Sequence, residues 1–167
     1  MMKRSLLILL AVALCLALLT ACSNQKAPAG ANSLYYCHTE YQYGVESGVV
    51  NCEYYKPPAS ASIEQILQRY LKGPESKDLV SPFPANTKLV SIELKDNKAQ
   101  ITFTKELAEC SNIDLTSACA SITLSVRDIT GYTVVDIRAQ DALLNNQKSI
   151  VMNAEELNLS DILSSSP

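Results

Sequence analysis

The sequence predicts an α+β domain in which a small, mostly antiparallel sheet carries two helices on one face. Two observations favour this fold class. Strand-like segments occur in pairs, as in β-hairpins, and two other segments have apolar residues at helical spacing. The segments follow one another in the order β-β-α-β-β-α-β. No internal repeat with a period of roughly 20–50 residues is visible, so a single domain is expected.

The first predicted hairpin is rich in tyrosine. Residues 34–39 and 49–55 have the aromatic and β-branched composition of strands, with Gly44 and Val45 at the turn between them. Six of the eight tyrosines belong to this region: Tyr35, Tyr36, Tyr41, Tyr43, Tyr54 and Tyr55. Exposed tyrosines can stack on sugars, but we interpret these as half-buried side chains that pack across the strands.

The clearest helix follows this hairpin. Ser62 is the expected N-cap, and Gln65 completes a capping box with it. One apolar face then continues to Leu71. Gly73 and Pro74 end the helix, because glycine tolerates the left-handed conformation that follows a helix and proline cannot extend one. Residues 82–84 (PFP) predict an ordered loop rather than a strand.

The second hairpin has strict alternation. Apolar and polar residues alternate over residues 90–94 and again over residues 99–103, with Asp96 and Asn97 as the turn between them. Each strand therefore has one apolar face, and the helix at residues 62–71 is the expected cover.

The C-terminal third predicts one more helix. Residues 105–117 are interpreted as a loop that holds Cys110, and a helix runs from Ser117 or Ala118 to about Ile129. Leu124 interrupts its apolar stripe, and Gly131 is the expected C′ residue. Residues 133–139 predict a strand, and residues 150–151 a short final one. The tail over residues 160–167 is expected to be frayed.

The N-terminus has the layout of a bacterial export signal. Lys3 and Arg4 precede an apolar run over residues 6–19, and Leu19-Thr20-Ala21-Cys22 resembles the lipobox of bacterial lipoproteins. The resemblance implies cleavage before Cys22 and a lipid on its sulfur, which would tether the protein at the extracytoplasmic face of the cell membrane. An ordinary secretory signal and a retained membrane helix are the alternatives. The apolar run is shorter than the roughly 20 residues that span a bilayer.

This interpretation divides the chain into four parts. Residues 1–21 form the signal peptide, residues 22–33 a small, polar, flexible tether, residues 34–159 the domain, and residues 160–167 the tail. Without the signal peptide the chain retains 12 of its 14 basic residues and all 17 acidic ones, a net charge of −5. A mildly acidic chain without a basic run is not expected to bind nucleic acid.

Four cysteines remain in the predicted mature chain apart from Cys22. They are Cys37, Cys52, Cys110 and Cys119. An even number outside the cytoplasm predicts disulfides, with three possible pairings. Proximity favours Cys37–Cys52, which fall opposite each other in a hairpin centred near Gly44 and Val45, and Cys110–Cys119. A zinc site is the weaker alternative, because no C-x-x-C occurs and neighbouring strand residues such as Cys37 and His38 point to opposite faces.

Three segments resemble the GerMN domain of sporulation and spore-germination proteins. Residues 66–74 (ILQRYLKGP) resemble its "LL.GP" helix end. Residues 84–96 (PANTKLVSIELKD) and 99–106 (AQITFTKE) resemble its "gTkLlsvslkdg.atvdfs" segment. The resemblance covers about residues 60–140 in order and spacing. It implies a fold like the ring-building motifs of secretion-like complexes, and a non-enzymatic module of the bacterial envelope with a protein partner.

The chain also departs from the GerMN pattern. The family's second helix reads like "si.yTLte", whereas residues 121–128 are SITLSVRD, and the following strand ends at residues 138–141 (RAQD) without glycine. Paired cysteines are not a hallmark of the family. These departures concern the identity of the partner more than the fold.

The residues offer little catalytic chemistry. The one histidine, His38, is expected at the surface without a nucleophile and acid beside it. Glu106 and Glu109 are interpreted as solvated charges, and residues 95–98 (KDNK) as a charged turn. No glycine-rich phosphate loop occurs. The sequence therefore predicts no enzyme, cofactor or metal. It predicts an envelope interaction module or, as the alternative, a lipoprotein that binds a small molecule or cell-wall fragment.

Overall fold

The computed structural model describes residues 27–39 and 50–157. The expected signal peptide, the turn at Gly44 and Val45, and the tail over residues 160–167 lie outside the described residues. The fold is α+β, as predicted, and within the described residues two α-helices accompany seven strands that form two sheets rather than one. The division into two sheets has a physical reason. The middle of the helix over residues 112–130 is buried on all sides, so each sheet packs against part of it.

The first sheet has the strand order β2-β1-β3, in which β1 is Asn32–His38, β2 is Val50–Tyr55 and β3 is Leu79–Val80. All pairings in it are antiparallel. Both faces of β1 are buried over residues 33–36, so its apolar and polar residues do not alternate.

The second sheet has the order β4-β5-β6-β7, comprising β4 (Leu89–Lys95), β5 (Lys98–Phe103), β6 (Val134–Ala139) and β7 (Ile150–Asn153). β5 and β6 are parallel and the other pairs antiparallel. The hairpin between β4 and β5 turns at Asp96 and Asn97, whose φ angles of 51° and 60° are those of a type I′ turn. The predicted turn and both of its strands are confirmed.

Helix α2 (Ile63–Leu71) agrees with its prediction to the residue. The side chain of Ser62 accepts from the backbone N–H of Gln65, and the Gln65 side chain accepts from the N–H of Ser62, completing the capping box. Gly73 follows with φ 92°, the conformation expected after the helix end. The buried side chains Ile66, Leu67 and Tyr70 lie on one face.

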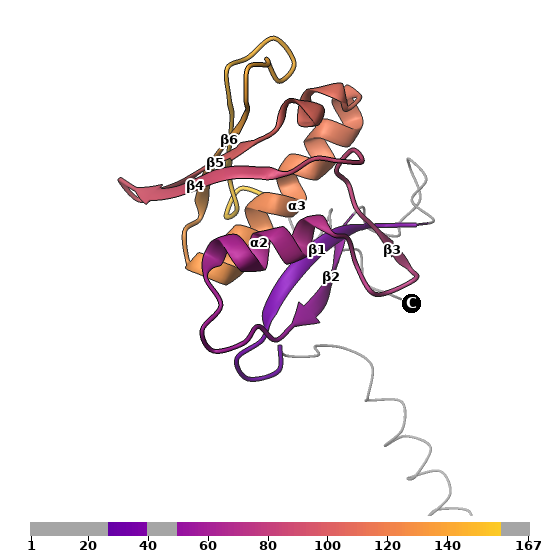
Figure 1. Cartoon of the computed structure of the whole chain (residues 1–167), viewed down its shortest axis with the longest axis vertical. Helices are drawn as coiled ribbons and strands as arrows, with labels where there is room; N and C mark the ends of the chain where they lie inside the picture. The colour runs from indigo at the N-terminus through magenta and orange to yellow at the C-terminus, as the bar shows by residue number, and fades with distance from the viewer. Residues whose placement is uncertain (1–26, 40–49, 158–167) are drawn as a thin grey trace, which may run out of the picture.

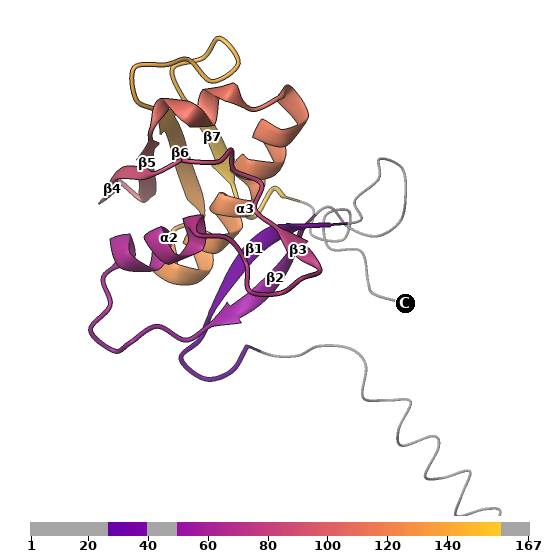
Figure 2. The same ribbon diagram turned by 45° about the vertical axis from the view of Figure 1, so that its right-hand side comes forward.

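Helix α3 (Asn112–Thr130) is longer than predicted. It begins five residues earlier, after the short 3₁₀ helix η1 (Lys105–Glu109), so most of the expected loop at residues 105–117 is helical. Ser111 caps it, and Gly131 ends it with φ 80°. α3 contacts β1 of one sheet and β6 and β7 of the other, and in both ribbon views it lies between the two sheets (Figures 1 and 2).

Two hydrophobic clusters follow from this central position. The main core joins both sheets to α2 and to one side of α3, including Leu67, Ile101 and Ile122. A smaller cluster on the other side of α3 contains Leu124 with Tyr35 of β1. Leu124 interrupts the predicted stripe because it belongs to this second cluster.

Candidate functional site

A pocket of about 440 Å³ lies where β1, β3 and the first turn of α3 meet. Its walls come from the ends of these elements and from the segments that join them. The lining residues are Cys37, His38, Val80, Ser81, Pro82, Phe83, Pro84, Glu109, Cys110, Ser111, Ile113, Asp114 and Ser117. The pocket combines apolar side chains with several convergent polar groups, so we take it as the candidate site.

One wall is the turn that follows β3. The Oγ of Ser81 accepts from the backbone N–H of Phe83 at 3.3 Å, and prolines on both sides of Phe83 restrict the backbone further. The Phe83 ring points into the core, with its centroid 5.7 Å from that of Tyr70 and 5.3 Å from that of Phe103. The wall is therefore fixed by aromatic packing beneath it.

The opposite wall is the start of α3. The backbone N–H of Asp114 donates to Ser111 Oγ at 3.2 Å, and Ser111 Oγ donates to Asp114 Oδ2 at 2.7 Å. This cap holds Asp114 in the first helical turn, where a negative charge is favoured by the helix dipole. Ile113, beside it, is 50% exposed.

The end of β1 completes the pocket. His38 pairs with Leu79 of β3, and its Nδ1 atom is buried without a hydrogen-bond partner among the described residues. His38 is expected at the surface, and in the structure its side chain is half-buried where it lines the pocket. The reason is tertiary, because β1 is the middle strand of its sheet and β3, far along the chain, covers it.

The thiols near the pocket are protonated at neutral pH. Burial raises the pKa of Cys37 to about 11, with a smaller contribution from the charge of Asp114. Burial, with Asp114 again adding to the effect, raises the pKa of Cys110 to about 11. A raised pKa is the opposite of what a nucleophilic cysteine needs.

The register of the first hairpin differs from the prediction. Cys37 lies opposite Val50, and Cys52 lies opposite Tyr35, so the two cysteines share a face but are diagonal neighbours. A slip by two residues keeps every side chain on the same face, so alternation in the sequence cannot distinguish the two registers. The predicted register, in which Cys37 lies opposite Cys52, is therefore wrong, and the pairing of these cysteines in an oxidised protein stays a prediction.

The other predicted cysteine sites have different outcomes. All four described cysteines are free thiols in the structure. Cys119 is buried on α3, and burial raises its pKa to about 12, with Cys110 contributing electrostatically. Both thiols contact the main core, and their pairing in an oxidised protein stays a prediction. Cys22 lies outside the described residues.

Three other kinds of feature would point to a function in the described part of the chain: a metal site, a membrane-spanning helix and a carboxylate pair. Within residues 27–39 and 50–157, no cluster of three or more histidine, cysteine, aspartate or glutamate side chains is placed to hold a metal ion. No helix in these ranges is long and apolar enough to cross a membrane. Glu109 lines the pocket whereas Glu106 does not, so the structure does not bring this carboxylate pair to one site.

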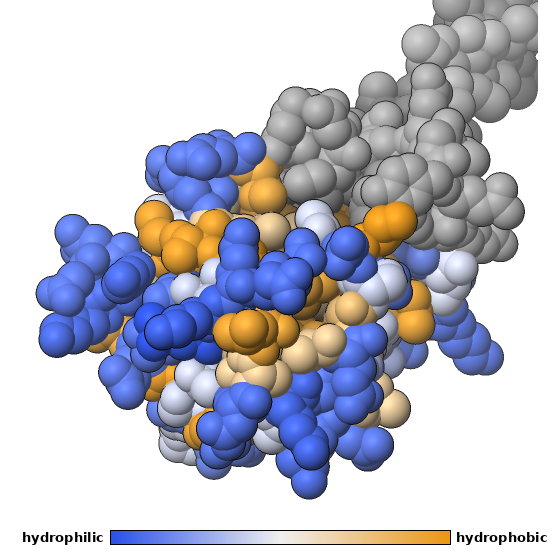
Figure 3. Space-filling model, turned by 90° about the horizontal axis from the view of Figure 1, so that it is seen from above, coloured by the Kyte–Doolittle hydropathy of each residue, from blue (hydrophilic) through white to orange (hydrophobic). Residues whose placement is uncertain are grey.

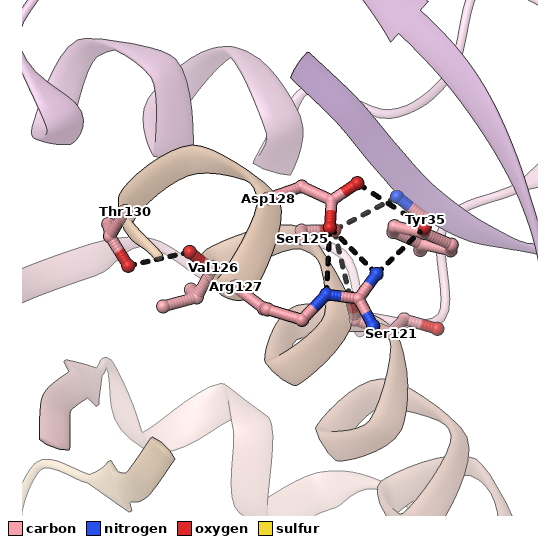
Figure 4. Close-up of polar contacts among 7 residues, drawn as sticks. All are labelled: Tyr35, Ser121, Ser125, Val126, Arg127, Asp128 and Thr130. Atoms are coloured by element: carbon pink, nitrogen blue, oxygen red, sulfur yellow. Dashed lines mark hydrogen bonds and ion pairs between the residues drawn. The ribbon is translucent and has the colours of Figure 1, made fainter. Parts of the chain in front are cut away.

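A second polar cluster joins β1 to α3 (Figure 4). The backbone N–H of Tyr35 donates to Ser125 Oγ at 2.9 Å, and the Tyr35 hydroxyl donates to Asp128 at 3.4 Å. Arg127 donates to the Tyr35 hydroxyl at 3.2 Å and forms an ion pair with Asp128 at 2.7 Å. Every group faces another protein group, so we interpret this cluster as structural.

Comparison with known proteins identifies the family. The sequence profile of the Germane family, described as "Sporulation and spore germination", matches residues 33–144. The chain belongs to the Germane family. No curated protein matches this chain.

Solved structures agree with the family assignment at the level of the fold. The chain is similar to the first GerMN domain of the sporulation protein GerM from Bacillus subtilis, with 17% identity and a TM-score of 0.54 over 74% of this chain and 95% of that one. It is also similar to the tandem GerMN domains of the same protein, with 18% identity and a TM-score of 0.55 over 81% of this chain and 50% of that one. The Germane domain here thus corresponds to one of two tandem domains, and the predicted resemblance is confirmed.

Sequence reasoning missed the pocket because its parts are distant in the sequence. The sequence predicts a loop around Ile113 and Asp114, and nothing local indicates that β3 lies beside the start of α3. One signal was available: the spacing of Ser111 and Asp114 is that of a helix cap and would have placed the helix start correctly.

Proposed function

We propose that this Germane protein is a lipoprotein at the extracytoplasmic face of the cell membrane, and that its domain is a non-enzymatic interaction module. The module would act in sporulation, germination or assembly of the envelope. One observation carries the proposal: the family match begins at residue 33, 11 residues after the lipobox cysteine Cys22. A domain joined to a lipidated residue by so short a segment stays near the membrane surface.

Two features of the domain support a non-enzymatic role. The thiols at the pocket have raised pKa values, so they are poor nucleophiles. The titratable groups in the second polar cluster, Tyr35, Arg127 and Asp128, are engaged with one another. Neither arrangement provides a nucleophile activated by a base.

The alternative function is binding of a small molecule or cell-wall fragment. The pocket of about 440 Å³ favours it, because this size is within the range of ligand sites. Tyr35 and Tyr36 do not favour it, because both are buried and their rings are not available to stack on a sugar. Binding of muropeptides by a protein that stays monomeric and captures no protein partner would support the alternative.

The tether is tested by a Cys22→Ser variant. In a bacterial host, the wild-type protein should label with a palmitate analogue and sediment with membranes, whereas Cys22→Ser should lose the label and leave the membrane fraction. Lipidation of the sulfur is the source of the affinity, so the loss should be nearly complete. The matched control is Cys15→Ser, which changes another cysteine of the apolar run and should label normally. Membrane retention of unlabelled Cys22→Ser would contradict the proposal.

A further inference from the structure

The pocket at β3 and α3 is negatively charged and apolar at once. Its apolar wall includes Phe83 and two prolines, and its rim carries Val80 and Ile113, which are 47% and 50% exposed. Among the described lining residues, the charged groups are Glu109 and Asp114, and none is a lysine or arginine. On the face seen from above, apolar side chains are interspersed among polar ones (Figure 3).

The two carboxylates are not neutralised within the described part of the protein. Neither Glu109 nor Asp114 forms a salt bridge with a described residue, although five such pairs form elsewhere among these residues. Asp114 uses Oδ2 to accept from Ser111, which leaves its charge in place. The charge acts inside the pocket, since it contributes to the raised pKa values of Cys37 and Cys110.

The histidine in the lining provides a buried polar group. His38 Nδ1 is buried and forms no hydrogen bond with the described residues. A buried ring nitrogen without a partner is unfavourable, so a ligand that donates to it, or accepts from it, would gain a hydrogen bond at this position.

Strand β3 offers a place for an extended chain. It is an outer strand of its sheet and pairs only with β1 among the described strands. Its free edge can add backbone hydrogen bonds to a bound segment. Because β3 has only two residues, side chains must supply most of the affinity and selectivity.

We propose that this pocket binds a basic segment of a partner protein, with a lysine or arginine beside Glu109 and Asp114 and a neighbouring apolar residue on Val80 and Ile113. This inference rests on the proposed function and names the chemistry of the partner. An anionic ligand is disfavoured, because Asp114 already occupies the first turn of α3 and repels negative charge. A second copy of this acidic chain is a less complementary occupant, since the net charge of the predicted mature chain, with 12 basic and 17 acidic residues, is −5.

Binding of short model peptides tests the proposal. The full chain is placed in phosphatidylcholine nanodiscs, which carry no net charge, and fluorescence polarisation measures binding of peptides with a central Leu-Lys-Leu or Leu-Arg-Leu. These should bind, and matched peptides with Leu-Gln-Leu or Leu-Glu-Leu should bind about two- to fivefold more weakly, the effect of one partly exposed charge interaction.

Variants locate the binding site. The double variant Glu109→Gln/Asp114→Asn should weaken binding of the Lys peptide about five- to tenfold, whereas Glu93→Gln on the outer face of the other sheet should not change it. Ile113→Ser should also weaken binding, whereas Leu143→Ser, which replaces a side chain of similar exposure (54%), should not. Circular dichroism establishes that each variant is folded.

Several results would overturn the proposal. Equal binding by all variants would indicate non-specific attraction of cations, and preference for the neutral or acidic peptide would indicate a different ligand. Self-association lost in Ile113→Ser would identify a second copy as the occupant. In cells, a photo-crosslinker at residue 143 or 151 that captures a partner, when one at residue 113 captures none, would overturn the pocket proposal and leave the interaction function intact.

Discussion

The two helices of this domain are buried in different ways. α2 is a surface helix that buries Ile66, Leu67 and Tyr70 and exposes Glu64, Gln65 and Gln68. α3 is an interior helix in which every residue from Ala118 to Val126 is buried. The difference arises because α2 packs on the rest of the domain through one face, whereas α3 lies between the two sheets.

This difference in burial explains why the sequence pattern predicts α2 more accurately than α3. One-sided burial leaves a contrast between apolar and polar faces, and α2 has that contrast. Burial on all sides removes the contrast between apolar and polar faces. In α3 even the polar side chains Ser121, Thr123 and Ser125 lie in the interior. Ser125 is useful there because its Oγ accepts from the backbone of β1 and donates to the carbonyl of Ser121 at 2.8 Å.

Alkaline pH should have the largest effect, because tyrosines attach α2 to β1. The Tyr70 hydroxyl donates to the Tyr35 carbonyl at 2.8 Å, and the Tyr36 hydroxyl donates to the Tyr70 carbonyl at 3.1 Å. Burial raises the pKa of Tyr35 to about 12 and raises the pKa values of Tyr36 and Tyr70 as well. A phenol with a raised folded-state pKa stabilises the fold fully below its unfolded pKa of 10.0, and this contribution is lost as the pH rises through the folded value.

Stability should therefore fall steeply between pH 10 and pH 12, by about 1.4 kcal/mol per pH unit for each of these tyrosines. Urea unfolding at a series of pH values, followed by circular dichroism, measures the slope. In Tyr35→Phe the slope should be smaller by about one such contribution. A free energy of unfolding that does not change over this pH range would contradict a stabilising role of the buried tyrosine hydroxyls.

Leu124→Ala tests whether α3 is buried on both sides. Leu124 and Ile122 are fully buried on opposite sides of the helix, so each alanine variant should lose about 3 kcal/mol of stability. On α2, Leu67→Ala should lose a similar amount, whereas Gln68→Ala on its exposed face should lose almost nothing. Urea unfolding measures all four variants. A loss below about 1 kcal/mol for Leu124→Ala would mean that α3 has an exposed face.

Ser125→Ala tests the polar attachment of α3. It leaves the buried N–H of Tyr35 without an acceptor, at a cost of about 2 kcal/mol. Ser62→Ala removes the exposed N-cap of α2 and should cost about 1 kcal/mol. Hydrogen exchange at the Tyr35 amide gives a local reading, and it should accelerate in Ser125→Ala more than in Ser62→Ala. Unchanged protection at Tyr35 would show that the bond is dispensable.

The glycines that end the helices should give the smallest effects. Gly131 and Gly73 have φ angles of 80° and 92°, and a Cβ at either position would meet no close neighbour. Replacement by alanine should therefore cost only the backbone strain, about 1 kcal/mol at each site. Thermal unfolding should show similar shifts for Gly131→Ala and Gly73→Ala. A clearly larger loss for Gly131→Ala would mean that the end of α3 is more constrained than its surroundings indicate.

Prediction from sequence succeeded where the interactions are local. The capping box of α2 and the Asp96-Asn97 turn involve residues a few positions apart, and both are confirmed. It failed for the start of α3, where Asn112, Asp114 and Thr116 have low helix propensity and the packing of Leu115 and Ala118 stabilises the helix instead. The candidate pocket could not be predicted, because it joins residues from Cys37 to Ser117.

The amino-acid sequence by itself determined the fold class, the family, the hairpins and α2, because these depend on short-range patterns of capping, turns and one-sided burial. It also carries the lipobox that predicts lipidation of Cys22. Only the tertiary structure decided the division into two sheets, the register that places Cys37 opposite Val50, and the pocket beside α3. The physical reason is that registers two residues apart expose the same faces, and that an interior helix has no polar face to reveal its partners.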